Sequence, residues 1–293
     1  MASILVIGMA VVDFVFGLDQ MPDKAQKYRA KSASIVGGGT AANAAVAAVR
    51  LGGKAYLGGR LGDDHMGDLI TTDLQKEGVD ITCIQRSPGA QSSYSSVYLD
   101  ADGERQIVNF RGARLCTDTH WIDLAPSVDA VLVDSRWVDA SISALKLART
   151  RGIPGVLDAE APIDERLLAL ASHIAFSKQG LLSLTSANSL PNALLEVAQS
   201  VPGFCCVTDG ANGTFYVADN KVNSVPAFPV KVIDTLGAGD IWHGAFTLKI
   251  AEGASEQEAM VFANAAAAIK CTYLGGRQGC PNRTATEHFI KEK

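Results

Sequence analysis

The chain has 293 residues, of which 47% are hydrophobic and 19% are charged, and its formal net charge is −5. This is enough apolar material for one large α/β domain, while the acidic balance argues against a nucleic-acid partner, whose phosphates require a basic surface. The apolar start of the chain carries Asp13 and no preceding basic residue, so we predict a buried first strand rather than a signal peptide or membrane span. Six cysteines without a CxxC spacing indicate reduced thiols and a cytoplasmic protein.

Short apolar strands and helices alternate along most of the chain. Strands are predicted at 4–7, 130–134, 155–158, 173–177 and 204–208, and helices at 40–51, 67–76, 142–150, 163–171, 193–200 and 256–273. Continuous apolar strands that alternate with helices are typical of a parallel sheet covered on both faces. We therefore predict a single α/β domain over 1–293, an αβα sandwich with a mostly parallel central sheet.

Two stretches, 14–36 and 91–112, break this pattern because their apolar and polar residues alternate. The second contains a hairpin whose turn is Asp-Ala-Asp-Gly at 100–103. Half-exposed strands of this kind do not belong in a buried parallel sheet. We expect them to form a small β-sheet lid over the carboxyl edge of the main sheet, where α/β proteins bind ligands. Its exposed strand edges favour a homodimer formed through the lid.

The stretch "DTLGAGDIWHGA" at 234–245 places a flexible turn, a helix start and a carboxylate within a few residues. Backbone N–H groups of Gly237, Ala238 and Gly239 at a helix N-terminus make an anion site. Asp240 beside them suits phosphoryl transfer, in which a base accepts a hydroxyl proton while amides stabilise the transferred group. The alternative is that Asp240 only caps the helix. Neither a GxxxxGK[ST] loop nor a GxGxxG turn after the first strand is present.

Four further stretches accompany this one: "GMAVVD" at 8–13, "GGGTAANAAVAAVRLG" at 37–52, "GGRLGDDHMG" at 58–67 and "VTDGANG" at 207–213. Together with DTLGAGD they resemble the landmarks of the PfkB (ribokinase-like) carbohydrate kinases, over essentially the whole chain. The resemblance implies a ribokinase-like fold and an ATP-dependent sugar kinase that uses Mg²⁺ and possesses a K⁺ site.

Carried over by position, the resemblance implies a role for each matching residue. Asp240 is the catalytic base, and Gly237, Ala238 and Gly239 form the anion hole. The sugar is held by Asp13, Gly38, Gly39 and Asn43, and the nucleotide by Thr208, Gly210 and Asn264. Asp234 and Thr235 belong to the monovalent-cation site. A strand-end carboxylate such as Asp13 suits sugar hydroxyls because it accepts two hydrogen bonds at once.

One landmark differs from the family pattern. The family has an Asn-x-x-Glu segment that organises Mg²⁺, whereas "FSKQGLL" places Ser177 and Gly180 at those positions. Mg²⁺ is still expected to arrive with ATP, whose phosphates need charge neutralisation.

Arg136 in "DSRWVD" is the residue that bears on the substrate, because it follows a buried strand at the ligand edge of the sheet. It either forms a structural ion pair with Asp134 or Asp139 or binds an anionic group on the sugar. The pieces "QKYRA", "IVNF", "DSRWVD", "AFSKQGL" and "KCTYLGGRQG" are similar to the sulfofructose kinase branch of the family. That similarity implies 6-deoxy-6-sulfofructose, phosphorylated at its C1 hydroxyl, with Lys27, Asn109 and Arg136 around the sulfonate.

Alternatives to this function remain open at the level of sequence. A fructokinase-like, ribokinase-like or nucleoside kinase would act on a neutral substrate. A non-catalytic sugar sensor would keep the fold, but it has no use for a base such as Asp240. His243, three residues after Asp240 on the same helix face, either tunes that carboxylate or simply packs in the core.

Overall fold

A sheet of eight strands runs through the centre of the computed structural model, which describes residues 1–101 and 104–293. The strand order is β14-β13-β12-β11-β10-β9-β1-β4. The six neighbouring strands from β12 to β4 are parallel, whereas β13 pairs antiparallel with both β12 and β14. The strands are β1 Ser3–Ile7, β4 Lys54–Gly58, β9 Ala130–Val133, β10 Gly155–Ala159, β11 His173–Ser177, β12 Phe204–Thr208, β13 Thr214–Ala218 and β14 Lys221–Val225.

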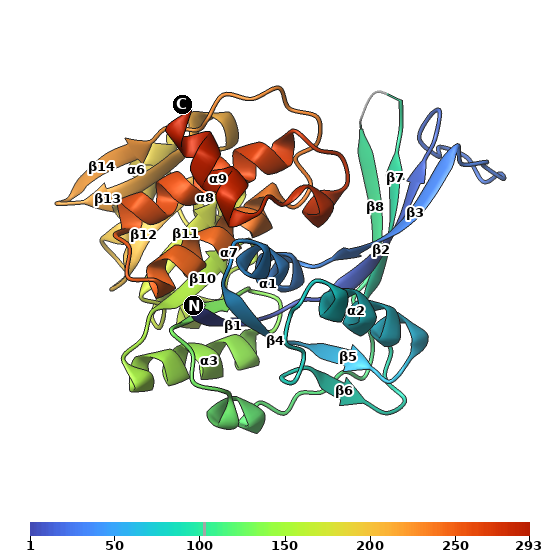
Figure 1. Cartoon of the computed structure of the whole chain (residues 1–293), viewed down its shortest axis with the longest axis horizontal. Helices are drawn as coiled ribbons and strands as arrows, with labels where there is room; N and C mark the ends of the chain where they lie inside the picture. Colours follow the sequence, from blue (N-terminus) through green and yellow to red (C-terminus); the bar gives the residue numbers. More distant parts are fainter. Residues whose placement is uncertain (102–103) are drawn as a thin grey trace.

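Helices cover both faces of this sheet (Figure 1). Because strand side chains alternate between faces, Ile4 and Val6 of β1 pack with α1, α7 and α8, whereas Leu5 and Ile7 pack with α3, α4 and α6. This gives an αβα sandwich, as predicted. The helices are α1 Thr40–Arg50, α2 His65–Lys76, α3 Val138–Arg151, α4 Glu165–Leu168, α5 Lys178–Leu182, α6 Leu190–Ala198, α7 Ala238–Ala251, α8 Glu256–Cys271 and α9 Arg283–Lys291.

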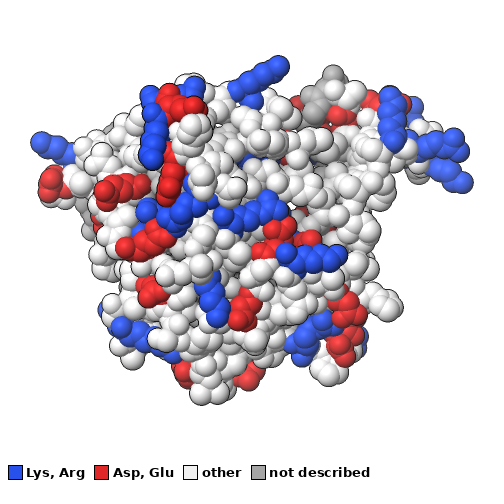
Figure 2. Space-filling view, viewed as in Figure 1, with Lys and Arg blue, Asp and Glu red and all other residues white. Residues whose placement is uncertain are grey.

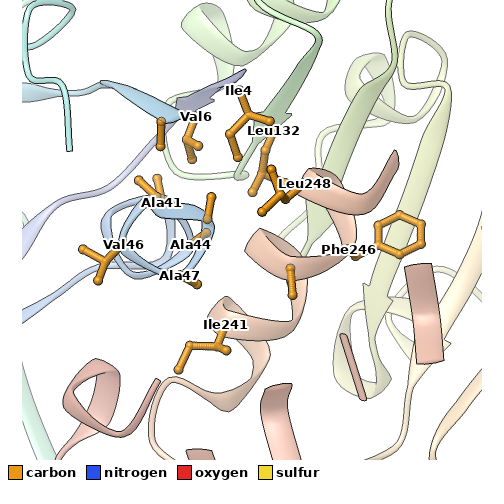
Figure 3. Packing of buried hydrophobic residues seen from close by; sticks show 14 of the residues in the cluster. Ile4, Val6, Ala41, Ala44, Val46, Ala47, Leu132, Ile241, Phe246 and Leu248 are labelled. Atoms are coloured by element: carbon orange, nitrogen blue, oxygen red, sulfur yellow. The ribbon is translucent and has the colours of Figure 1, made fainter. Parts of the chain in front are cut away.

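Helices α1 and α7 pack closely against each other on one face of the sheet. Small residues make this possible: a Cβ atom at Gly244 of α7 would overlap the carbonyl oxygen of Ala44 in α1. Around this contact, Ala41 and Ala47 of α1 and Ile241 of α7 lie in one apolar cluster (Figure 3). The close packing brings the N-terminal ends of two helices far apart in sequence to the same place.

The second sheet is the predicted lid, with strand order β3-β2-β7-β8. Its strands are β2 Val11–Gly17, β3 Ser32–Gly38, β7 Tyr94–Leu99 and β8 Arg105–Phe110. The sheet is mixed, because β2 pairs parallel with β7 and antiparallel with β3. It projects from the α/β body beside α1 and α2 (Figure 1). The predicted turn at 100–103 includes two positions, 102 and 103, that lie outside the described residues.

Several elements of the structure differ from the prediction. The expected helix at 163–171 is only Glu165–Leu168, because Ser172 already pairs with Gly155 to start β11. Helix α3 begins at Val138, four residues before its predicted start. The strands β4, β13 and β14 were not predicted, since their sequences mix polar residues among the apolar ones. Two short strands, β5 Arg60–Gly62 and β6 Gln85–Ser87, form a separate pair.

Charged side chains of both signs are interspersed over the face shown in Figure 2. Lys and Arg gather at the free end of the lid, where the loop between β2 and β3 lies. That loop carries the exposed residues Lys24, Lys27, Arg29 and Lys31. Within the described residues, no helix has both the length and the apolarity to span a membrane.

Candidate active site

The N-terminus of α7 has the geometry of an anion site. Gly237 precedes the helix with φ 75°, a left-handed conformation that glycine adopts without strain, and no side chain of the described residues caps the helix. The N–H of Ala238 donates to the Thr235 carbonyl oxygen at 3.1 Å. The N–H groups of Gly239 and Asp240 face no acceptor among the described residues, and a Cβ atom at Gly239 would meet open space. The helix start therefore presents two amides with room for an anion in front of them.

Asp240 lies directly beside these amides and is held by α1. The Nδ2 atom of Asn43 donates a hydrogen bond of 2.7 Å to its Oδ2. Burial raises the pKa of the Asp240 carboxyl to about 7, although the Asn43 hydrogen bond lowers it. Such a carboxylate can accept a proton near neutral pH. The Oδ1 atom of Asn43 is buried and has no partner among the described residues, so it can accept a hydrogen bond from a substrate hydroxyl.

A second buried carboxylate, Asp158 at the end of β10, lies behind Asp240. Burial raises the pKa of Asp158 to about 6, and the neighbouring His243 imidazole opposes this rise. The Nε2 atom of His243 is 3.5 Å from Asp158 Oδ1, and its Nδ1 atom is 2.8 Å from the Gly239 carbonyl oxygen. His243 thus packs in the core and ties the first turn of α7 to the sheet, and it also lowers the pKa of Asp240, so both predicted alternatives describe it. The negative charge of Asp158 helps to raise the pKa of Asp240.

Asp13 and Asn109 lie in one row across the lid sheet. Asp13 on β2 is in register with Ser95 on β7, which is in register with Asn109 on β8. Residues in register point to the same face, and Asn109 Nδ2 donates to Ser95 Oγ at 3.0 Å. Burial raises the pKa of Asp13, opposed by the Ser95 hydrogen bond and by the charge of Arg277. Gly38 packs directly against this row, and a Cβ atom there would displace the Asp13 carboxylate from its position.

The carboxylate of Asp134 fixes three segments that border the site. Its Oδ2 accepts hydrogen bonds from the Met9 N–H at 2.7 Å, just before the lid, and from Thr40 Oγ1 at 2.6 Å, at the start of α1. Its Oδ1 accepts from the Arg136 N–H at 2.8 Å. Gly39, with φ 95°, makes the turn into α1. Asp134 therefore holds together the start of the lid at Met9, the turn from the Gly-Gly segment into α1, and the loop that carries Arg136.

Arg136 forms an ion pair, but with neither of the predicted partners. Its Nη2 donates to the carboxylate of Glu160, and its Nη1 donates to the Ala161 carbonyl oxygen at 3.3 Å. Asp134 accepts only its backbone N–H, so Glu160 replaces the expected Asp134 or Asp139. Lys27 lies on the exposed loop at the free end of the lid, and the structure does not bring it into contact with Asn109 or Arg136.

A cavity of about 480 Å³ opens next to the α7 N-terminus. The cavity is lined by residues predicted to bind the nucleotide, the transferred group or a cation: Thr208, Gly210, Asn264, Thr235, Ala238 and Gly239. An apolar wall completes it, formed by Phe228, Pro229, Val230, Val232 and Trp242. No sequence motif marks the 226–232 segment, so sequence reasoning missed this wall.

Asn264 contributes to the cavity through its position rather than through free polar atoms. Its Oδ1 accepts from Thr214 Oγ1 at 2.8 Å and from Trp242 Nε1 at 2.7 Å. Its Nδ2 donates to the Val225 and Pro226 carbonyl oxygens. All four hydrogen-bonding positions of the amide are therefore used within the protein. Asn264 fixes Trp242 and the end of β14 as walls of the cavity.

The residues at the positions expected to organise Mg²⁺ do not fit that task. Ser177 caps α5, with its Oγ accepting from the Gly180 N–H at 2.9 Å. No side chain fits at Gly180, because a Cβ atom there would overlap the Ala159 carbonyl oxygen. Among the described residues, no group of three or more His, Cys, Asp or Glu side chains could hold a metal ion.

The positions expected to bind a monovalent cation do not fit a free ion either. The Nζ atom of Lys270 lies 2.7 Å from the Asp234 carbonyl oxygen and 3.2 Å from its Oδ2. The side chain of Lys270 is fully buried there. Thr235, the other predicted position, lies on the wall of the cavity instead.

An αβα sandwich with a β-lid, an anion site and an adjacent carboxylate is the arrangement a phosphotransferase needs, and comparison with known proteins gives the class. The model of the pfkB family of carbohydrate kinases matches residues 1–283, so the chain belongs to this family.

Similar proteins include several kinases. The ribokinase of Bacillus subtilis is 29% identical, with 99% of this chain and 100% of that protein covered. A solved structure from Agrobacterium tumefaciens, provisionally named a ribokinase, is 36% identical with a TM-score of 0.91, covering 99% and 98% of the two chains. Arabidopsis thaliana ribokinase, solved with ribose and ATP, is 26% identical with a TM-score of 0.88 and 99% coverage of both chains. Curated relatives that match also include fructokinases of rice and maize, each 29% identical.

The pH dependence of the reaction tests the role of the Asn43–Asp240 contact. Since the pKa of Asp240 is about 7, kcat/KM should fall about tenfold per pH unit below that value and level off above it. Replacing Asn43 with Ala removes a hydrogen bond that favours the ionised carboxylate, so the midpoint should move to higher pH. Steady-state rates across the acidic to mildly alkaline range measure both midpoints. The exposed Asn192→Ala variant is the control and should keep the wild-type midpoint. An unchanged or lowered midpoint in Asn43→Ala would contradict this role.

Proposed function

We propose that the protein is an ATP-dependent sugar kinase in which Asp240 is the general base. The observation that carries this proposal is a carboxylate with a pKa near 7 beside two unpaired helix amides. Asp240 takes the proton of the attacking hydroxyl, and the hydroxyl oxygen forms a bond to the γ-phosphorus as the bond to ADP breaks. The Gly239 and Asp240 N–H groups bind the transferred group, where charge builds up.

ATP fits the cavity beside α7. The apolar wall of Phe228, Val230 and Val232 suits the adenine ring, and the Thr208–Gly210 turn lies where the phosphates would lead toward Gly239. Mg²⁺ would arrive bound to the phosphates and neutralise their charge, since the 177–180 segment offers it no carboxylate. We place the enzyme in the cytoplasm, where ATP is available and its six free cysteines stay reduced.

The lid supplies the other side of the sugar site. Asp13 and Asn109 share one face of the lid sheet, and Asp134 ties the beginning of the lid to the start of α1. With a sugar between lid and body, Asp13 accepts hydroxyl hydrogen bonds while Asn43 Oδ1 accepts another. Closure of the lid excludes water, which otherwise competes with the sugar hydroxyl for the phosphoryl group.

For the substrate, we propose a ketohexose with an anionic group, 6-deoxy-6-sulfofructose, phosphorylated on its C1 hydroxyl. Arg136 supports this proposal because it lies at the carboxyl edge of the sheet and is partly exposed. Within the described structure, Glu160 and Ala161 occupy two of its five N–H groups, so others remain for a sulfonate. Asn109 adds an amide from the lid. Lys27 joins this set only by the similarity of its local sequence.

A neutral sugar is the second candidate, and one contact favours it. Glu160 already neutralises the charge of Arg136, so the site does not require an anionic substrate. The ribokinase and fructokinase relatives agree with ribose or fructose, and a nucleoside is a further neutral possibility. A sensor without catalysis is disfavoured, because Asp240 keeps both its amides and its Asn43 contact.

A panel of sugars with ATP and Mg²⁺ separates these candidates. We expect the highest kcat/KM for 6-deoxy-6-sulfofructose over fructose, fructose 6-phosphate, ribose and adenosine. Arg136→Ala should lower that kcat/KM by about a hundredfold, the size expected for a charged hydrogen-bonded pair, with little effect on fructose. Arg149→Ala, an exposed arginine on α3, is the matched control. A wild-type preference for ribose or fructose that survives Arg136→Ala would refute the anionic substrate.

We also propose that the protein is a homodimer joined through the lid. Four large apolar side chains are exposed on the described lid strands: Ile35 at 58%, Tyr94 at 39%, Ile107 at 53% and Val108 at 60%. Ile35 and Val108 lie in one row across the sheet, on the face opposite Asp13, whereas Ile107 lies on the same face as Asp13. Together with the open edges of β3 and β8, Ile35 and Val108 make a surface that a second lid would cover.

Light scattering coupled to gel filtration tests the dimer. The wild-type protein should have twice the mass of one chain, and Val108→Asp should shift it toward the monomer by placing a charge in the contact. Leu124→Asp changes a still more exposed apolar residue outside the lid and should stay dimeric. A monomeric wild-type mass at working concentration would overturn the proposal.

A further inference from the structure

A fully buried ammonium group lies next to the loop that leads into α7. It belongs to Lys270 in the last turn of α8, whose side chain has no exposed surface. Its Nζ donates to the Asp234 carbonyl oxygen at 2.7 Å and lies 3.2 Å from Asp234 Oδ2. A longer contact of 3.4 Å reaches the Tyr273 carbonyl oxygen. The ammonium is therefore surrounded by one carboxylate and two carbonyl oxygens.

The partner of this ammonium is held in its charged form. Although burial raises the pKa of Asp234, the N–H groups of Leu236 and Gly275 and the charge of Lys270 bring it below its usual value. The Asp234 carboxylate also accepts from the Gly276 N–H at 3.3 Å. A buried charge without a partner is strongly unfavourable, so each member of this pair requires the other.

The pair joins two loops whose contact shapes the anion site. Asp234 leads into Thr235, whose carbonyl oxygen holds the first N–H of α7, and then into Gly237 at the start of the helix. Gly237 faces the backbone of Gly276 and Arg277, on the loop that the Asp234 carboxylate binds. The ammonium of Lys270 therefore fixes the position of the turn at Asp234. Because this turn leads into α7, it also fixes the positions of the Gly239 and Asp240 amides.

A role confined to its own helix does not explain this position. A lysine in the last turn of a helix interacts favourably with the helix carbonyl end. However, the contact of this kind that the described residues give Lys270, to the Tyr273 carbonyl oxygen just after α8, is the longest one, and both shorter contacts reach Asp234 on another segment. The position of Lys270 is therefore explained by its contacts with the loop at Asp234.

We propose that Lys270 is a built-in substitute for a monovalent cation, so that the enzyme does not depend on K⁺. Ammonium and K⁺ have the same charge and similar size, and carboxylate and carbonyl oxygens bind both. Two cations cannot share one small set of oxygens, because they repel each other. Lys270 is thus a positioning residue for the phosphoryl site. Because its ammonium group is part of the chain, the site holds a positive charge whatever the K⁺ concentration.

The wild-type enzyme provides the first test. KCl, NaCl and choline chloride are compared at one ionic strength, with the thermal midpoint Tm and the affinity for a non-hydrolysable ATP analogue by calorimetry as readouts beside activity. An ion that does not bind adds no stability, so Tm, affinity and kcat should be the same in all three salts. A saturable rise of any of them with K⁺ alone would overturn the proposal. The Tm and affinity readouts need no sugar, so a wrong substrate assignment leaves them interpretable.

The second test removes the ammonium. In choline chloride, Lys270→Met should lose at least about tenfold in kcat and in affinity for the ATP analogue, since Asp234 is left unpaired and its turn is released. K⁺ or NH₄⁺ should restore much of this loss and raise Tm, whereas choline should not. Lys146→Met, an exposed lysine on α3, should match the wild type in every salt.

Lys270→Gln is made in parallel, because its amide can still donate a hydrogen bond to the Asp234 oxygens while it removes the charge. If either variant is as active as the wild type without K⁺, or if its loss is not restored by K⁺ or NH₄⁺, Lys270 does not stand in for a cation. A rescue by K⁺ that is absent with choline is the result a merely structural lysine would not give.

Discussion

The site depends on one hydrogen bond that joins two helices 197 residues apart, from Asn43 at the start of α1 to Asp240 at the start of α7. It forms only because Gly244 and the alanines of α1 let the two helices lie in backbone contact on the same sheet face. The same packing removes water around Asp240 and raises the pKa of its carboxyl. Close helix packing therefore sets both the position and the proton affinity of the catalytic group.

Buried charges at the sheet edge extend this arrangement to the rest of the site. Asp134 connects the lid hinge, the start of α1 and the Arg136 loop, while Asp234 and Lys270 connect the α7 turn to the loop after α8. The Asp134 carboxylate is buried and the Asp234 carboxylate is partly buried, both among hydrogen-bond donors, so moving one segment leaves a polar group unpaired. The fold thus holds the phosphoryl site rigid on its body side and places the sugar side on the lid.

Much of the fold and part of the site could be predicted from the sequence. The five apolar strands are local patterns, and the Gly237–Asp240 turn is a local motif, so both were found. The partner of Arg136 was not, because Glu160 follows the neighbouring strand β10, whose register with β9 no short motif encodes. The apolar wall of the cavity at 226–232 carries no sequence motif. Lys270 was not singled out either, because it lies in an alanine-rich helix and only the tertiary structure shows that its side chain is buried.

The most direct test of the central claim is the rate of phosphoryl transfer by Asp240→Asn, a change of nearly the same shape that removes the base. With Tm and affinity for an ATP analogue retained, kcat should fall by about a hundredfold to ten-thousandfold, the contribution of a positioned general base. Loss of rate with intact nucleotide binding is the result this account predicts. Turnover of ATP and sugar at the wild-type rate would contradict it.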